Sequence, residues 1–220
     1  MNVPAVGRFV FRRAELWADG AIHVLGVALG LGAVTTLIVQ VASSAPLFDL
    51  LPVTIYGAAL LAVLIVSATY NMWPISRRKW FIRRFDHSAI YVLIAGTYTP
   101  FLMKLSASIF AQALLAIVWL AAAAGVAIKV ALPGRFDRLS IALYLLTGWS
   151  GLLIWESVSL LPPATLWLIV AGGLLYSIGV IFHVWESLPF QNAIWHGFVL
   201  VASGCFYGAV FQAYVMAPAA

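Results

Sequence analysis

Seven long apolar runs recur along the chain, and they constrain its fold more than any other feature. They cover residues 20–42, 50–71, 87–104, 109–131, 138–156, 164–184 and 192–216. Each run is long enough to cross the roughly 30 Å hydrocarbon core of a bilayer as an α-helix. Because 64% of the 220 residues are hydrophobic and only 9% are charged, a water-soluble fold could not bury the apolar surface.

The runs indicate an all-α protein. Only helices and closed barrels satisfy every backbone hydrogen bond in lipid, and the short alternating strands of a barrel are missing from the sequence. We therefore predict a seven-transmembrane helix bundle, with residues 1–220 forming a single integral-membrane domain. The third run is the shortest and contains Gly96 and Pro100, so we expect the irregular helix there.

Basic residues gather on one side of the predicted bundle. A block at residues 77–84 holds five of the twelve Lys and Arg residues. The same side also receives Arg8, Arg12, Arg13, Lys129, Arg135 and Arg138, whereas the other side receives Lys104 alone. The positive-inside rule then predicts a cytoplasmic N-terminus and an external C-terminus. Membrane topology and anionic lipid explain the net charge of +5 better than nucleic acid does.

Polar side chains cluster at the predicted cytoplasmic ends of five runs. They are Glu15, Asp19 and His23 in the first, Ser67 and Asn71 in the second, Asp86 in the third, His183 and Glu186 in the sixth, and Asn192 and His196 in the seventh. Ionisable groups are costly in a bilayer and are therefore candidates for function. We expect one polar site in this leaflet, although residues at helix ends can also be merely interfacial.

Four stretches resemble one known family. Residues 85–100 (FDHSAIYVLIAGTYTP) resemble the most characteristic segment of the hemolysin III and progestin/adipoQ receptor proteins. Residues 192–200 (NAIWHGFVL) resemble the family's last-helix motif, and residues 67–71 resemble its Ser-x-x-x-His motif. Residues 15–23 resemble its first-helix pattern of Glu, Asn and His. The resemblance covers nearly the whole chain and implies seven helices with a cytoplasmic N-terminus.

The resemblance also implies a zinc site and shows a departure from it. Family members hold zinc with three histidines, and an aspartate in the position of Asp86 acts on metal-bound water, so the resemblance makes Asp86 and Ser67 the candidate catalytic residues. Asn71 and Asn192 stand at two of the three histidine positions here, so only His196 remains. Since an amide is a poor zinc ligand, we expect a degenerate site. His23 or His183, with an oxygen from Asp19 or Asp86, are the available substitutes.

Three functions are open at this point. The first is a hemolysin III-like protein of the bacterial inner membrane, acting in membrane or lipid homeostasis, whose partners are the bilayer and a lipid ligand. Its polar site would be a metal-free network of Asn71, Asn192 and His196 around Asp86. The second is a ceramidase-like, metal-dependent lipid amide hydrolase with a rebuilt metal site, and the third is a channel or cytolytic pore.

The lone Cys205 excludes an intrachain disulfide.

Overall fold

The structure, a computed structural model, describes residues 12–216, and Arg8 from the predicted charge pattern lies outside them. Its helices are α1 (Arg13–Ser44), α2 (Leu50–Met72), α3 (Arg77–Lys104), α4 (Ile109–Ala131), α5 (Asp137–Trp149), α6 (Trp155–Val158), α7 (Pro163–Val184) and α8 (Gln191–Phe211). Two 3₁₀ turns, η2 (Leu47–Asp49) and η3 (Ser150–Ile154), and a π-helical turn, η4 (Gln212–Met216), complete it. No strand occurs in this range, so the all-α prediction is confirmed for residues 12–216.

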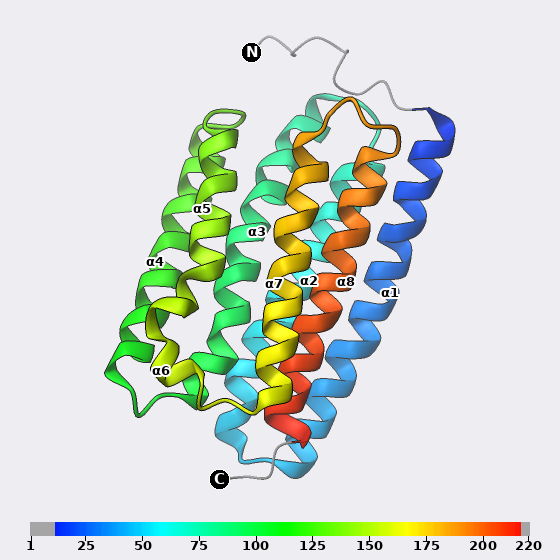
Figure 1. Cartoon of the computed structure of the whole chain (residues 1–220). Coiled ribbons are helices and arrows are strands. Elements are labelled where there is room, and N and C mark those ends of the chain that lie inside the picture. The colour runs from blue at the N-terminus through cyan, green and yellow to red at the C-terminus, as the bar shows by residue number, and fades with distance from the viewer. Residues whose placement is uncertain (1–11, 217–220) are drawn as a thin grey trace.

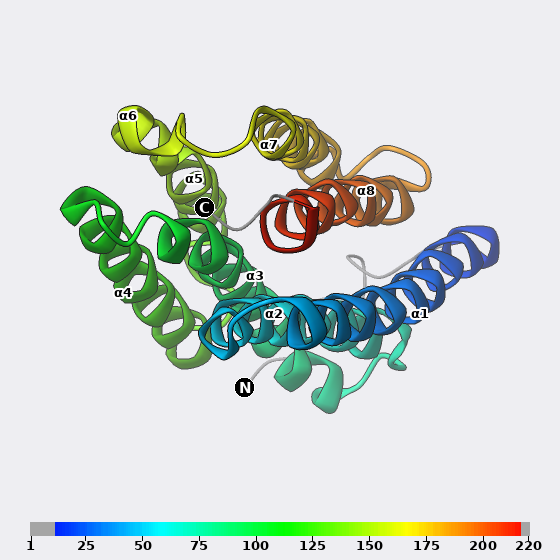
Figure 2. The ribbon, with the colours of Figure 1, turned by 90° about the horizontal axis from the view of Figure 1, so that it is seen from below.

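The long helices run side by side as one bundle (Figure 1). Viewed along the helices, α1, α2, α3 and α4 follow one another along one side of the bundle, and α8, α7 and α5 lie along the other (Figure 2). The first helix packs on both α2 and α8, so it joins the two rows. Through this packing α1 and α8, which lie at opposite ends of the sequence, come into direct contact.

Six helical stretches within the described residues are long and apolar enough to cross a membrane: 13–44, 47–72, 109–131, 137–158, 163–184 and 191–216. The protein is therefore built as an integral membrane protein. The remaining long helix, α3, has 28 residues and packs between α2 and α4. Its first turns carry the basic block, and its crossing of the membrane, which would make a seventh span, stays a prediction.

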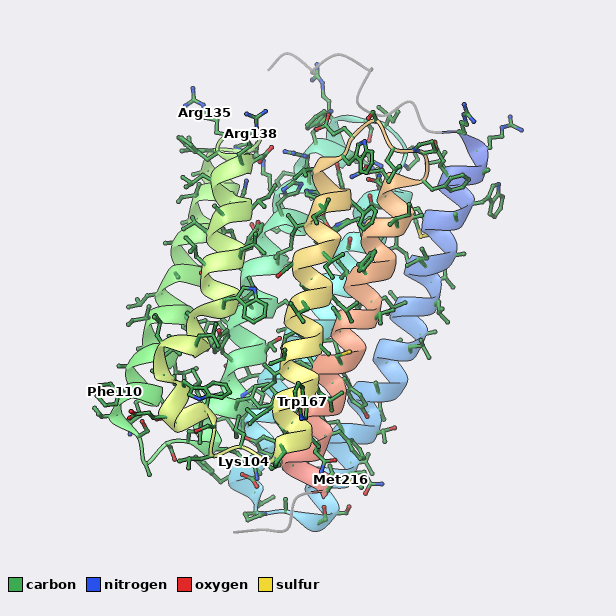
Figure 3. The ribbon with its side chains drawn as sticks, in the orientation of Figure 1. Lys104, Phe110, Arg135, Arg138, Trp167 and Met216 are labelled. Carbon is green, nitrogen blue, oxygen red and sulfur yellow. The ribbon has the colours of Figure 1, made fainter. Side chains whose placement is uncertain are left out.

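The two ends of the bundle differ in charge. We call the end where α1, α3, α5 and α8 begin the basic end. Arg135 and Arg138 lie at this end, whereas Lys104 and Met216 lie at the opposite end (Figure 3). This separation matches the uneven charge distribution in the sequence.

The irregular helix is not the one that the sequence indicated. Despite Pro100, α3 is a continuous α-helix, whereas the fifth run is broken into α5, η3 and α6. Tyr98 explains the break, since its hydroxyl donates to the Gly148 carbonyl at 2.8 Å and accepts from the Gly151 amide at 2.9 Å. A side chain from α3 thus replaces backbone hydrogen bonds within the fifth run, which no local sequence pattern reveals.

A close contact between α2 and α3 positions two of the predicted site residues. A Cβ atom built on Gly96 would lie 2.5 Å from the Cβ of Ala59, so only glycine allows this approach of the two helices. From this contact both helices continue to the basic end, where α2 carries Ser67 and α3 carries Asp86.

Candidate functional site

Three side chains from α1 and α8 converge near the basic end. Nδ1 of His196 lies 2.6 Å from Oδ1 of Asp19, which is a short hydrogen bond. Nε2 of His23 lies 3.7 Å from Oδ2 of Asp19, and the two imidazole rings are 4.3 Å apart between centroids. Asp19 and His23 are buried, and His196 is largely so. Two imidazoles and one carboxylate therefore share a single small space.

One polar atom of this cluster has no hydrogen-bond partner among the described residues. Nε2 of His23 is buried, and its distance to Asp19 is beyond hydrogen-bonding range. Leaving a buried polar atom unsatisfied costs about 1–3 kcal/mol. The free lone pair or N–H at Nε2 of His23 consequently leaves the cluster one position at which a further ligand can bind.

Local structure brings these residues together. Asp19 and His23 are four residues apart on α1 and so project from one face of that helix. The carboxylate of Glu15, one turn earlier, accepts hydrogen bonds from the backbone amides of Arg12 at 2.8 Å and Phe190 at 3.0 Å. Phe190 has the left-handed φ of 59° immediately before α8 begins. Glu15 thus fixes the start of α8 against α1.

Asp86 and Ser67 lie next to the cluster. The Asp86 carboxylate is half-buried and interacts with the Ser67 hydroxyl, and His196, Arg83 and Asp19 are near enough to influence its charge. The predicted pair of Asp86 and Ser67 is thus adjacent to His196. A second acid and a hydroxyl are available beside the imidazole and carboxylate groups.

The two asparagines do not form a zinc site of the family's kind. The amide nitrogen of Asn71 donates to the Ser67 carbonyl at 3.0 Å and to the Ser67 hydroxyl at 3.3 Å. Its amide is therefore engaged within α2, and no hydrogen bond joins Asn71, Asn192 or His196 to one another among the described residues. Amide oxygens are also weak ligands for zinc. The residues at positions 71, 192 and 196 do not fit the three-histidine zinc site.

His183 and Glu186 lie outside the central cluster. The His183 ring packs 4.9 Å from the ring of Trp195, and the His183 carbonyl accepts a hydrogen bond from Gln191 at 2.8 Å. Glu186 lines a separate polar pocket of about 250 Å³ together with Glu15. Of the ten residues predicted for the site, Asp19, His23 and His196 form the cluster, Asp86 and Ser67 lie beside it, and Asn71 is bonded to Ser67.

Two cationic features of this end were missed by sequence reasoning. Lys79 is buried, and its ammonium donates to the carbonyls of Asn71 at 3.1 Å and Trp73 at 3.0 Å, which caps α2. Asp137 accepts from buried Lys129 at 2.7 Å and from Arg83 at 3.0 Å, which links α3, α4 and α5. In the sequence these cations lie in or beside loops, and only the tertiary fold reveals their burial.

A helical membrane protein with a polar site at one end of its bundle is the class that this geometry defines. The haemolysin-III related family matches residues 11–207 of the chain. The chain therefore belongs to the hemolysin III family, as its motifs indicated.

Curated relatives from bacteria and animals agree with this membership. The chain is 36% identical to a hemolysin-3 homolog of Bacillus subtilis (strain 168) over 95% of its own length and 99% of the relative's. It is 35% identical to hemolysin-3 of Bacillus cereus, over 88% of its length and 89% of the relative's. The human monocyte to macrophage differentiation factor is 30% identical over 72% of this chain and 68% of that protein. No solved structure matches the chain.

Proposed function

We propose that this protein binds a membrane lipid by its polar groups in the cytoplasmic leaflet and thereby serves membrane-lipid homeostasis. The observation that carries the proposal is the convergence of Asp19, His23, His196 and Asp86 at the basic end of an otherwise apolar bundle. By the positive-inside rule this end faces the cytoplasm, with α3 as a seventh span. In a bacterium, the host membrane is the inner membrane.

The depth and chemistry of the site suit a lipid. Near the end of membrane helices, a buried cluster lies level with the polar linkages that join acyl chains to headgroups. The Asp19–His196 pair can accept a proton, and Asp86 and the unsatisfied His23 can hydrogen-bond amide, hydroxyl or phosphate groups. A cluster restricted to one end favours a binding site over a channel or cytolytic pore.

Lipids that stay with the purified protein test this proposal. We expect the wild-type protein in mild detergent to retain one lipid class above its share in the host membrane, as measured by mass spectrometry. Asp86→Asn and Asp19→Asn should each lose most of this enrichment because they remove the charges that recognise the headgroup region. His87→Gln, on the same helix as Asp86, is the matched control. A wild-type lipid profile equal to that of the membrane would contradict lipid binding.

Hydrolysis of a lipid amide is a second candidate, and the contact between Asp86 and Ser67 beside His196 favours it. A carboxylate next to an imidazole can hold and transfer a proton during attack of water on a carbonyl group. Release of fatty acid from a fluorescent ceramide by protein in nanodiscs is the direct assay. Turnover should fall at least about 100-fold in Asp86→Asn, and it should survive in His87→Gln.

A further inference from the structure

We propose that Asp19, His23 and His196 bind one divalent transition-metal ion between α1 and α8. One potential ligand atom from each residue lies within 4.8 Å of the other two. The donor set is two imidazole nitrogens and one carboxylate oxygen, which suits zinc and the neighbouring ions cobalt(II) and iron(II). The site shares His196 alone with positions 71, 192 and 196 of the family's pattern, so the metal centre has been rebuilt on the first helix.

The distances already approach those of a bound ion. Ligand atoms at about 2.1 Å from a tetrahedral ion are roughly 3.4 Å apart. Nε2 of His23 and Oδ2 of Asp19 are 3.7 Å apart, close to this spacing, whereas His196 approaches the other oxygen, Oδ1, so an ion held by all three residues requires the side chains to shift. The hydrogen bond of 2.6 Å between Asp19 and His196 holds a proton where the ion would bind. Metal binding would replace this proton, which leaves to solvent, and would separate the two atoms by about 1 Å.

The surroundings of the cluster also favour a cation. The two imidazoles have their ring centroids 4.3 Å apart, so a proton on each would place two like charges together in a buried space. Neutral imidazoles instead offer lone pairs, and the Nε2 of His23 has no hydrogen-bond partner among residues 12–216. A single ion between them satisfies this nitrogen and balances the charge of Asp19.

The coordination number has a chemical consequence. Three protein ligands leave a fourth position open for water or for an oxygen atom of a bound lipid. Asp86 lies close enough to His196 to interact with it electrostatically. The rebuilt site thus has an acid at its margin and an exchangeable ligand position.

Metal uptake by the purified full-length protein tests this inference. Protein carrying a tag without histidine is stripped with a chelator in detergent, exposed to zinc or cobalt(II), desalted and analysed for bound metal. We expect about one ion per chain and a cobalt absorption spectrum typical of mixed nitrogen and oxygen ligands. Asp19→Asn and His23→Gln should each weaken binding about tenfold or more.

Two controls separate this site from the alternatives. His87→Gln removes a histidine near the same end without touching the cluster and should leave metal binding unchanged. The double variant Asn71→Ala, Asn192→Ala should also retain the ion, whereas a site at the family's positions would lose it. Size-exclusion profiles of the metal-free proteins establish that each variant is folded. If His23→Gln aggregates, Asp19→Asn measured by the same assay decides the question.

Specific outcomes would overturn the inference. They are wild-type protein that takes up no zinc or cobalt at saturating concentration, or Asp19→Asn and His23→Gln proteins that bind it as tightly as wild type does. Loss of metal from the Asn71→Ala, Asn192→Ala protein would place the ion elsewhere and would equally exclude the rebuilt site. The assay contains no lipid substrate, so its failure leaves lipid binding standing, and a failed lipid assay leaves metal binding standing.

Discussion

Asp19 links the two histidines of the cluster, and its chemistry decides what the site can hold. It contacts His23 four residues away on its own helix and His196 across the bundle, 177 residues away in sequence. The family resemblance gives an asparagine at this position, and an aspartate adds the negative charge that a cation requires. The same chain has asparagine at two positions where the resemblance gives histidine. The family's histidine ligands at these positions are therefore missing, and the proposed site uses the carboxylate of Asp19 instead.

Restoring the family's histidines provides a residue-level prediction. In a His23→Ala background, which should not bind zinc tightly, we expect Asn71→His with Asn192→His to recover about one ion per chain. His196 would then complete a set of three imidazoles carried by α2 and α8. Metal content after desalting is the measurement. Asn71→His alone, with two histidines, should bind far more weakly, and no gain in the full variant would mean that α2 and α8 are too far apart here.

From the sequence one could predict which residues gather at one end of the bundle, but only part of their contacts. Asp19 and His23 were placed on one face because helical periodicity is local. The hydrogen bond between Asp19 and His196 depends on how α1 packs on α8, and no spacing along the chain encodes that distance. Asn71 illustrates the converse, since its amide bonds to Ser67 within its own helix rather than to Asn192 or His196.

At the scale of the elements, the contact between α2 and α3 determines where Ser67 meets Asp86. Gly96→Ala would place a Cβ 2.5 Å from Ala59 and force the helices apart. Overpacking of this kind destabilises the fold by about 1–3 kcal/mol. Replacing glycine with alanine in a helix gains only roughly 1 kcal/mol from helix propensity, so the net effect on stability is a loss. We expect a lower melting temperature in detergent and weaker lipid retention.

Two variants make this prediction specific to the interface. Adding Ala59→Gly to Gly96→Ala moves the extra methyl group to the other helix and should restore most of the stability. Gly32→Ala, at a position with nothing within 4 Å of the new Cβ, should be neutral or stabilising. Equal melting temperatures for Gly96→Ala and Gly32→Ala would mean that the bundle tolerates a wider separation of α2 and α3.

Helix type could be predicted from the length of the apolar runs, whereas helix irregularity could not. Pro100 removes one backbone donor, yet α3 stays helical because it is packed between α2 and α4. The fifth run contains no proline between residues 138 and 156, but Tyr98 supplies it with hydrogen bonds from outside and so stabilises a break at Gly148–Gly151. Tertiary packing in α3 and tertiary hydrogen bonds in the fifth run thus outweighed the local signals.

At the scale of the whole molecule, membrane sidedness connects the fold to the proposed function. The basic end carries the site, and a lipid of the cytoplasmic leaflet reaches it only if that end faces the cytoplasm. This orientation also requires α3 to cross the membrane, since its first residues lie at the basic end and its last residue, Lys104, lies at the other (Figure 3).

The single native cysteine makes this topology directly testable. After Cys205→Ser, new cysteines at Arg77 and Ala107 flank α3, and both positions are exposed. In intact cells, a membrane-impermeant maleimide should label Ala107→Cys from outside and leave Arg77→Cys unlabelled. Both should react after permeabilisation, which controls for accessibility. Equal labelling of the two in intact cells would mean that α3 does not cross, and labelling of Arg77→Cys alone would reverse the orientation and move the site to the outer leaflet.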